Sequence, residues 1–111
     1  MPGIVLLDQA GPLPITIKFD AELDGPVTFV LTGTAFTSAA PTTIAYVLLL
    51  DGQIIGKSAL YANQSLNHQA LRTTLIPFDN LTLGTHTMVI SANNIDTKTD
   101  FNDYFQVTMI Y

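Results

Sequence analysis

Apolar and polar residues alternate with a period of two along much of this chain. The alternation runs through Leu13–Phe19 and Val27–Leu31, and it returns near the end in Phe105–Met109. Successive side chains of a β-strand point to opposite faces, so each stretch is predicted to be a half-buried strand. No window of a dozen residues keeps the i, i+3, i+4, i+7 spacing of an amphipathic helix. The pattern therefore predicts an all-β protein.

The clearest turn signal is the dipeptide Asp51-Gly52, which separates two β-rich runs in TTIAYVLLLDGQIIGKSALY. A type I′ hairpin turn needs positive φ at both central residues, and Asp-Gly meets that need. Residues 44–50, just before the turn, are apolar at odd and even positions alike, so both faces of the predicted strand are apolar. Such a strand is covered on both sides, so its second face is expected to meet another segment of the chain or a neighbouring subunit.

The second half of the chain predicts further strands. ALRTTLIPF is expected to form a strand that Pro77 stops, DNLTLG a corner and HTMVISA another strand. Seven or eight short strands separated by turn signals are typical of a sandwich. We therefore predict a single domain over residues 1–111, folded as an antiparallel β-sandwich that is either immunoglobulin-like or a jelly roll.

Composition narrows the classes of partner. Only 12% of the 111 residues are charged, 48% are apolar and none is cysteine, so disulfides and thiolate chemistry are excluded. The net charge is −5 and the four basic residues are scattered, which disfavours nucleic acid and anionic membrane surfaces. Weakly charged surfaces tend to be occupied by partners, and a homo-oligomer is expected.

The beginning of the chain shows no basic segment and no cleavage motif of a secretory signal. Its longest apolar run, residues 44–50, is too short to cross a bilayer as a helix. We expect an extracellular or virion protein without a visible signal peptide, with a cytoplasmic location left open. The chain is either a whole protein or a module of a larger one.

The segment LTLGTHTMVISAN resembles the strand-F entry of bacterial immunoglobulin-like and fibronectin-type-III-like modules. In those modules Leu-x-x-Gly-x-His leads into an alternating strand, and Leu81, Gly84 and His86 match that pattern. The resemblance implies that Leu81 fills the core, that Gly84 supplies the corner, and that His86 points inward and bonds a backbone group. It implies a fold rather than an activity.

The best candidate for chemistry is the loop before the last strand. It is rich in side-chain oxygens, which are the ligands that Ca²⁺ takes in sets of six to eight. The candidate ligand-binding residues are Asn93, Asn94, Asp96, Asp100, Asn102 and Asp103. The alternative is a solvated loop with Asx-turns, in which Asp103 fixes the start of the last strand.

The tetrad Asp100-Phe101-Asn102-Asp103, followed by a terminal strand, also resembles the calcium loop of two-calcium bacterial lectins that bind fucose or mannose. That resemblance implies that Asp100, Asn102 and Asp103 are calcium ligands and that sugar hydroxyls complete the metal shell. Two positions depart from the lectin pattern. Lys98 stands where an acid belongs, and the last residue is Tyr111 rather than glycine.

Other candidates receive plainer interpretations. The two histidines, His68 and His86, would need a converging acid to form a metal or acid–base site, and strand-entry or interface roles are expected for both. The sequence around Ser58 lacks the second glycine of a nucleophile elbow. Of the tyrosines, Tyr61 and Tyr104 lie near predicted strand ends, where a sugar could stack.

These observations predict a protein that is not an enzyme. The expected function is that of a structural or binding module, homo-oligomeric, in a surface appendage, adhesin or virion. The alternative is a calcium-assisted carbohydrate-binding lectin. No cofactor is expected other than calcium, and carbohydrate or other surface proteins are the expected partners.

Overall fold

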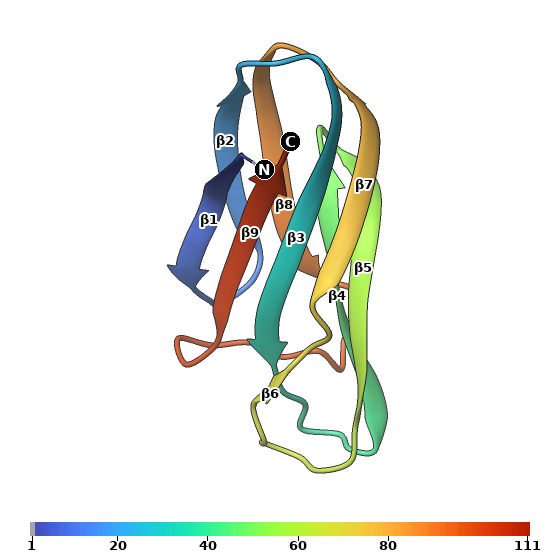
Figure 1. Cartoon of the computed structure of the whole chain (residues 1–111). Coiled ribbons are helices and arrows are strands. Elements are labelled where there is room, and N and C mark those ends of the chain that lie inside the picture. Colours follow the sequence, from blue (N-terminus) through green and yellow to red (C-terminus); the bar gives the residue numbers. More distant parts are fainter. Residues whose placement is uncertain (1) are drawn as a thin grey trace.

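The computed structural model describes residues 2–111 and contains two antiparallel sheets packed face to face (Figure 1). The first sheet has the order β1-β9-β3-β7, with the short β6 also pairing with β3, and the second has the order β2-β8-β4-β5. The strands of the described residues are β1 (Gly3–Ala10), β2 (Ile15–Ala21), β3 (Gly25–Ala35), β4 (Thr42–Leu50), β5 (Gln53–Ala62), β6 (Gln69–Ala70), β7 (Thr74–Leu81), β8 (Gly84–Ala92) and β9 (Tyr104–Ile110).

The strand order is that of a jelly roll, which was one of the two predicted alternatives. The chain changes sheet between β1 and β2, between β2 and β3, between β3 and β4 and between β5 and β6, and it does so again on either side of β8. Among the strands of residues 2–111, β4 and β5 alone are neighbours both in sequence and in one sheet. Two facing four-stranded sheets connected in this way form the two Greek keys of a jelly roll.

The predicted alternation is confirmed in the strands that line the core. In β3, every second residue from Val27 to Ala35 is buried, and the residues between them are half-buried. In β9, Phe105, Val107 and Met109 point inward with at most 1% of their surface exposed. The core lies between the inner faces of the two sheets, as the period of two requires.

Strand β4 is buried on both faces within the chain itself. Its inward residues include Tyr46 and Leu48, which are fully buried, while outward-facing Ala45 and Val47 are only 2% and 6% exposed. Val47 is paired with Lys57 on one side and Ser91 on the other. The sequence left open whether the chain itself or a neighbouring subunit covers the second face of this strand. The low exposure of Ala45 and Val47 shows that the chain itself covers most of it.

Two features of the strands differ from the sequence prediction. Pro77 does not stop a strand, because β7 runs through it to Leu81. Strand β7 pairs only with β3 and is an edge strand, so it tolerates a residue without an N–H group. Strands β1 and β6 were not predicted: β1 is largely exposed and lacks a clean alternation, and β6 has only two residues.

The connections divide the elongated molecule, which measures 43 × 24 × 21 Å, into two ends. Short connections at residues 22–24, 51–52 and 82–83 form what we call the turn end (Figure 1). The opposite end, which we call the long-loop end, carries residues 11–14, 36–41, 63–73 and 93–103 (Figure 1). No helix of residues 2–111 has the length and apolar character needed to span a membrane.

Candidate functional site

The long-loop end gathers three segments that are far apart in sequence. Strand β6 pairs with the end of β3, with Ala35 opposite Gln69. That pairing places His68 beside Phe36, and their ring centroids lie 4.3 Å apart. Strand β9 starts next to the same part of β3, with Gly33 opposite Phe105. His68 and the Asp100–Asp103 tetrad therefore meet around the end of β3.

Asp103 is the centre of this cluster. Its side chain is fully buried, and its two oxygens accept hydrogen bonds from three donors. Oδ1 accepts from Thr34 Oγ1 and from His68 Nδ1, both at 2.8 Å, and Oδ2 accepts from the backbone N–H of Asp100 at 2.9 Å. A buried carboxylate is expensive unless it is paired in this way. Asp103 thus ties β9, β3 and His68 together.

Asp100 closes the turn on its exposed side. Its Oδ1 accepts the Asn102 N–H at 2.8 Å, and its carbonyl accepts the Asp103 N–H at 3.1 Å. This Asx-turn holds residues 100–103 in a fixed shape. The Asp100 side chain remains 44% exposed, and Phe101 between these polar residues is 82% exposed. The turn therefore presents a carboxylate, an amide and an aromatic ring to solvent.

His68 lies between the two carboxylates. Its Nδ1 is 2.8 Å from Asp103 Oδ1 and its Nε2 is 3.8 Å from Asp100 Oδ2. The hydrogen bond to Asp103 raises the pKa of His68, with a smaller contribution from the charge of Asp100. Sequence reasoning did not connect His68 with the tetrad. No local signal marks this contact, which depends on β6 pairing with β3.

Three other residues of the predicted ligand-binding set form hydrogen bonds to strand β4 instead. Asn94 Oδ1 accepts the N–H and hydroxyl of Thr97 at 3.0 and 2.7 Å, and its amide donates to Thr43 O in β4. Asp96 Oδ2 accepts from Thr42 Oγ1 at 3.1 Å. The side chain of Asn93 is exposed, while its N–H donates to Ala45 O. These three residues fasten the loop to β4, whereas Asp100 and Asp103 face His68.

One group in this cluster has the composition of a metal site. One ligand atom from each of His68, Asp100 and Asp103 lies within 4.8 Å of the other two. Two of these residues belong to the predicted calcium set and the third is the histidine that the sequence left apart. The arrangement combines an imidazole nitrogen with carboxylate oxygens, which is a donor set used by divalent cations.

The structural residues of the predicted hairpin and corner lie at the turn end. Asp51 and Gly52 form the turn with φ values of 51° and 85°, and Gly84 begins β8 at 116°. Leu81 is buried in the core. His86 is 8% exposed, with Nε2 2.7 Å from Thr82 O and Nδ1 2.6 Å from Asp51 Oδ2.

The two histidines do not form one site. His86 contacts the β4–β5 turn at the turn end, while His68 contacts the start of β9 at the long-loop end. The hydrogen bond to Thr82 O raises the pKa of His86 most, and the hydrogen bond to Asp51 raises it further. The contact between His86 and Asp51 also lowers the pKa of Asp51. Ser58 is buried and donates its hydroxyl proton to Arg72 O. Each of these groups has a partner within the fold.

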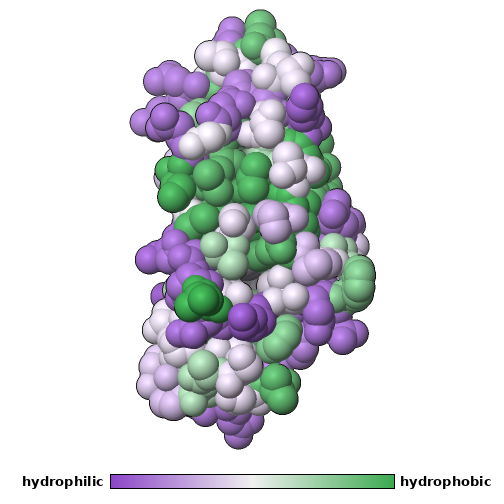
Figure 2. Space-filling view, turned by 180° about the vertical axis from the view of Figure 1, so that it is seen from behind, coloured by the Kyte–Doolittle hydropathy of each residue, from purple (hydrophilic) through white to green (hydrophobic). Residues whose placement is uncertain are grey.

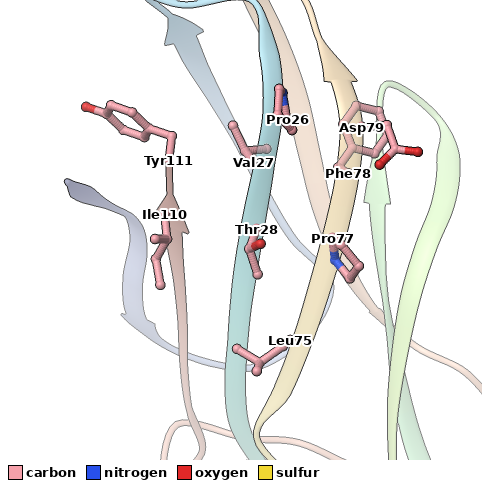
Figure 3. A pocket seen from close by; sticks show the side chains of 9 residues that line it. All are labelled: Pro26, Val27, Thr28, Leu75, Pro77, Phe78, Asp79, Ile110 and Tyr111. Atoms are coloured by element: carbon pink, nitrogen blue, oxygen red, sulfur yellow. The ribbon is translucent and has the colours of Figure 1, made fainter. Parts of the chain in front are cut away.

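A hollow of about 430 Å³ lies on the outer face of the first sheet (Figure 3), and none of its lining residues belongs to the tetrad. Its sides come from β3, β7 and the end of β9, and its lining is mostly apolar. Tyr111 stands at one side of the view, and Asp79 points away from the floor (Figure 3). The lining residues are Pro26, Val27, Thr28, Leu75, Pro77, Phe78, Asp79, Ile110 and Tyr111.

No protein-family model matches the chain, and no curated protein matches it. Solved structures with a similar fold were found. Dimeric latent PorU from Porphyromonas gingivalis aligns with a TM-score of 0.62 and 13% identity over 87% of this chain. The chain spans only 10% of the PorU chain.

Two other similar structures are close to this chain in size. A family 35 carbohydrate-binding module from Clostridium thermocellum aligns with a TM-score of 0.57 and 10% identity, over 96% of this chain and 90% of the module. The C-terminal domain of EclA, described as a sugar-binding protein, aligns with a TM-score of 0.52 and 13% identity, over 97% and 76%. At these identities the likeness shows a shared β-sandwich fold.

Proposed function

We propose that this chain is a non-enzymatic binding module that takes carbohydrate at the long-loop end. The observation that carries the proposal is the fixed turn of residues 100–103. It holds the Asp100 carboxylate and the Asn102 amide on either side of Phe101, whose ring is 82% exposed. The buried Asp103 anchors this turn to β3, so the backbone that carries the three exposed groups is held in place.

Sugars present two kinds of surface, and the turn offers a partner for each. The C–H face of a pyranose packs on aromatic rings, and its hydroxyls donate to carboxylates and exchange hydrogen bonds with amides. Binding sites commonly combine an apolar contact with a few fixed polar groups. Groups that are already fixed lose little entropy when the ligand binds. The similarity to a carbohydrate-binding module and to a sugar-binding domain supports this assignment.

The test is direct binding to a panel of neutral, acidic and amino sugars, followed by calorimetry on the best ligand. Phe101→Ala and Asn102→Ala should each weaken binding at least about tenfold while leaving the melting temperature unchanged, because both side chains are exposed. Ile95→Ala is the matched control, since Ile95 lies in the same loop and is 86% exposed. Unchanged affinity in both site variants would place the sugar elsewhere.

Calcium dependence is a second candidate for the same turn. It is favoured by the two carboxylates of Asp100 and Asp103, which lie within reach of one ion. The exposed Asn102 would supply a further oxygen, and sugar hydroxyls would complete the shell. A ligand that binds only the folded state raises its stability by mass action. An equal melting temperature in excess EDTA and in millimolar calcium would contradict this candidate.

Self-association on a surface appendage, adhesin or virion is part of the same proposal. Apolar side chains form a belt across the outer face of the second sheet (Figure 2). In the second sheet, Leu49 is paired with Val89 and with Ile54, which is 65% exposed. Charged residues make up only 12% of the chain, so little opposes contact between copies. A light-scattering mass equal to one chain at roughly tens of micromolar would contradict self-association.

A further inference from the structure

His68 has one ring nitrogen committed to the fold and one directed at a carboxylate. Asp103 Oδ1 is 2.8 Å from Nδ1 and also accepts the Thr34 hydroxyl proton, so Nδ1 is the nitrogen that carries hydrogen. In the neutral ring the lone pair is then on Nε2. Nε2 lies 3.8 Å from Asp100 Oδ2. The cluster therefore sets an imidazole lone pair next to a half-exposed carboxylate oxygen.

This arrangement matches a recurring way of holding a metal ion. A histidine ligand commonly donates its other N–H to a carboxylate, which fixes the tautomer and the orientation of the ring. Asp103 has this role here, because it is fully buried and its two oxygens already accept from three donors. Contact with the tilted Phe36 ring, at 4.3 Å between ring centroids, restrains the His68 ring further.

The distances require only a small adjustment. Two ligand atoms about 2.0–2.1 Å from one zinc ion are about 3–3.5 Å apart in tetrahedral geometry. The separation of His68 Nε2 and Asp100 Oδ2 is 3.8 Å. The Asp100 side chain is 44% exposed and can turn toward Nε2 while Oδ1 keeps its bond to the Asn102 N–H. Water would fill the other positions.

We propose that His68 Nε2 and Asp100 Oδ2 bind a first-row transition cation of the zinc class, and that Asp103 positions His68 without binding the ion. The imidazole nitrogen distinguishes this site from a calcium loop, since imidazole suits zinc, copper, nickel and iron whereas calcium takes oxygen ligands. The proposal does not depend on sugar binding, which can be measured separately in EDTA.

The first experiment compares melting temperatures of the full chain with zinc, calcium, magnesium or EDTA. Zinc at about 1 mM should raise the melting temperature by roughly 5 °C, as expected for a site of modest affinity in a domain of this size. His68→Gln and Asp100→Asn should each abolish most of the shift. His86→Gln and Asp96→Asn are matched controls and should retain it, because neither residue belongs to the cluster.

The second experiment identifies the atom that binds. Ring ¹⁵N shifts of His68 in the metal-free protein should show a protonated Nδ1, and zinc should perturb Nε2. Cobalt, as a coloured substitute, should give a visible absorption band that His68→Gln removes. A zinc shift that survives in both site variants, a shift of equal size with calcium, binding at Nδ1, or no shift with any cation would overturn the proposal. In the last case His68 is an ion-pair partner of the carboxylates only.

Discussion

Asp51 and His86 are joined by a 2.6 Å contact between Oδ2 and Nδ1, although 35 residues separate them. The other oxygen of Asp51 accepts the Thr87 N–H at 2.9 Å, and the Asp51 N–H donates to Thr87 O at 2.8 Å. The residue that starts the β4–β5 turn therefore also clamps that turn to β8. Asp51-Gly52 forms the turn through its backbone preferences, and the Asp51 side chain in addition makes tertiary contacts with β8.

This clamp predicts a pH-dependent stability. The pKa of His86 is raised above its usual 6.5, so its contribution is complete below about pH 6.5 and is lost as the pH rises through the folded value. The pKa of Asp51 is lowered from 3.8, so its contribution is present above about pH 3.8 and is lost as the pH falls through the folded value. The clamp should stabilise most between these limits.

Asp51→Asn tests the clamp, because asparagine tolerates the positive φ of the turn but carries no charge. We expect a loss of about 1 kcal/mol near pH 5.5, kept small by the half-exposed carboxylate. The difference from the parent protein should shrink by about pH 8.5. Asp79→Asn, at an exposed acid, is the control. A constant difference across this range in urea titrations would contradict a charged clamp.

Asp103→Ala should destabilise the protein by about 2–4 kcal/mol, because the Thr34 hydroxyl and the Asp100 N–H would lose their hydrogen-bond acceptor at a fully buried position. The loss is measured as a lower urea midpoint with an unchanged slope. Asn102→Ala, one residue away and exposed, should change the free energy of unfolding by less than about 0.5 kcal/mol. Equal losses in the two variants would show that Asp103 has no special part in anchoring β9.

The sequence predicted the parts of the fold that depend on local pattern. The alternation of residues 105–109 identified both β9 and its inward face, and Asp51-Gly52 located the hairpin. The strand order could not be read in this way, because alternation says which face is buried but not which strand is adjacent. Pro77 was misjudged for the same reason, since its effect depends on whether the strand lies at an edge.

The candidate site was predicted in part. The oxygen-rich segment was recognised from its composition, and its Asx-turn at Asp100 agrees with the solvated-loop alternative. The histidine could not be assigned, because His68 and Asp103 are 35 residues apart and meet only through the pairing of β6 with β3. A two-residue strand carries no periodicity, so the sequence contains no signal for the pairing that builds the cluster.

Tyr46→Phe should leave the stability unchanged or raise it by up to about 1 kcal/mol. The Tyr46 side chain is fully buried, and its hydroxyl has no hydrogen-bond partner among the described residues. Burial raises its pKa to about 12. Ser58 donates its own proton to Arg72 O. A loss above about 1 kcal/mol in chemical denaturation would mean that the hydroxyl has a bonded partner.

Gly33 leaves no room for a side chain in the core. A Cβ atom at Gly33 would overlap the rings of Phe105 and Tyr46, which pack against each other at 5.6 Å between centroids. Both rings are fully buried in a close-packed core, so neither can move without displacing its neighbours. We expect Gly33→Ala to cost about 1–3 kcal/mol, the usual range for overpacking. Gly3→Ala is the matched control, because a Cβ atom there makes only ordinary contacts of 3.5 Å or more, and it should change the urea midpoint little. Equal stability of the two variants would mean that the rings have room to separate, and the core around Phe105 would then be looser than these contacts require.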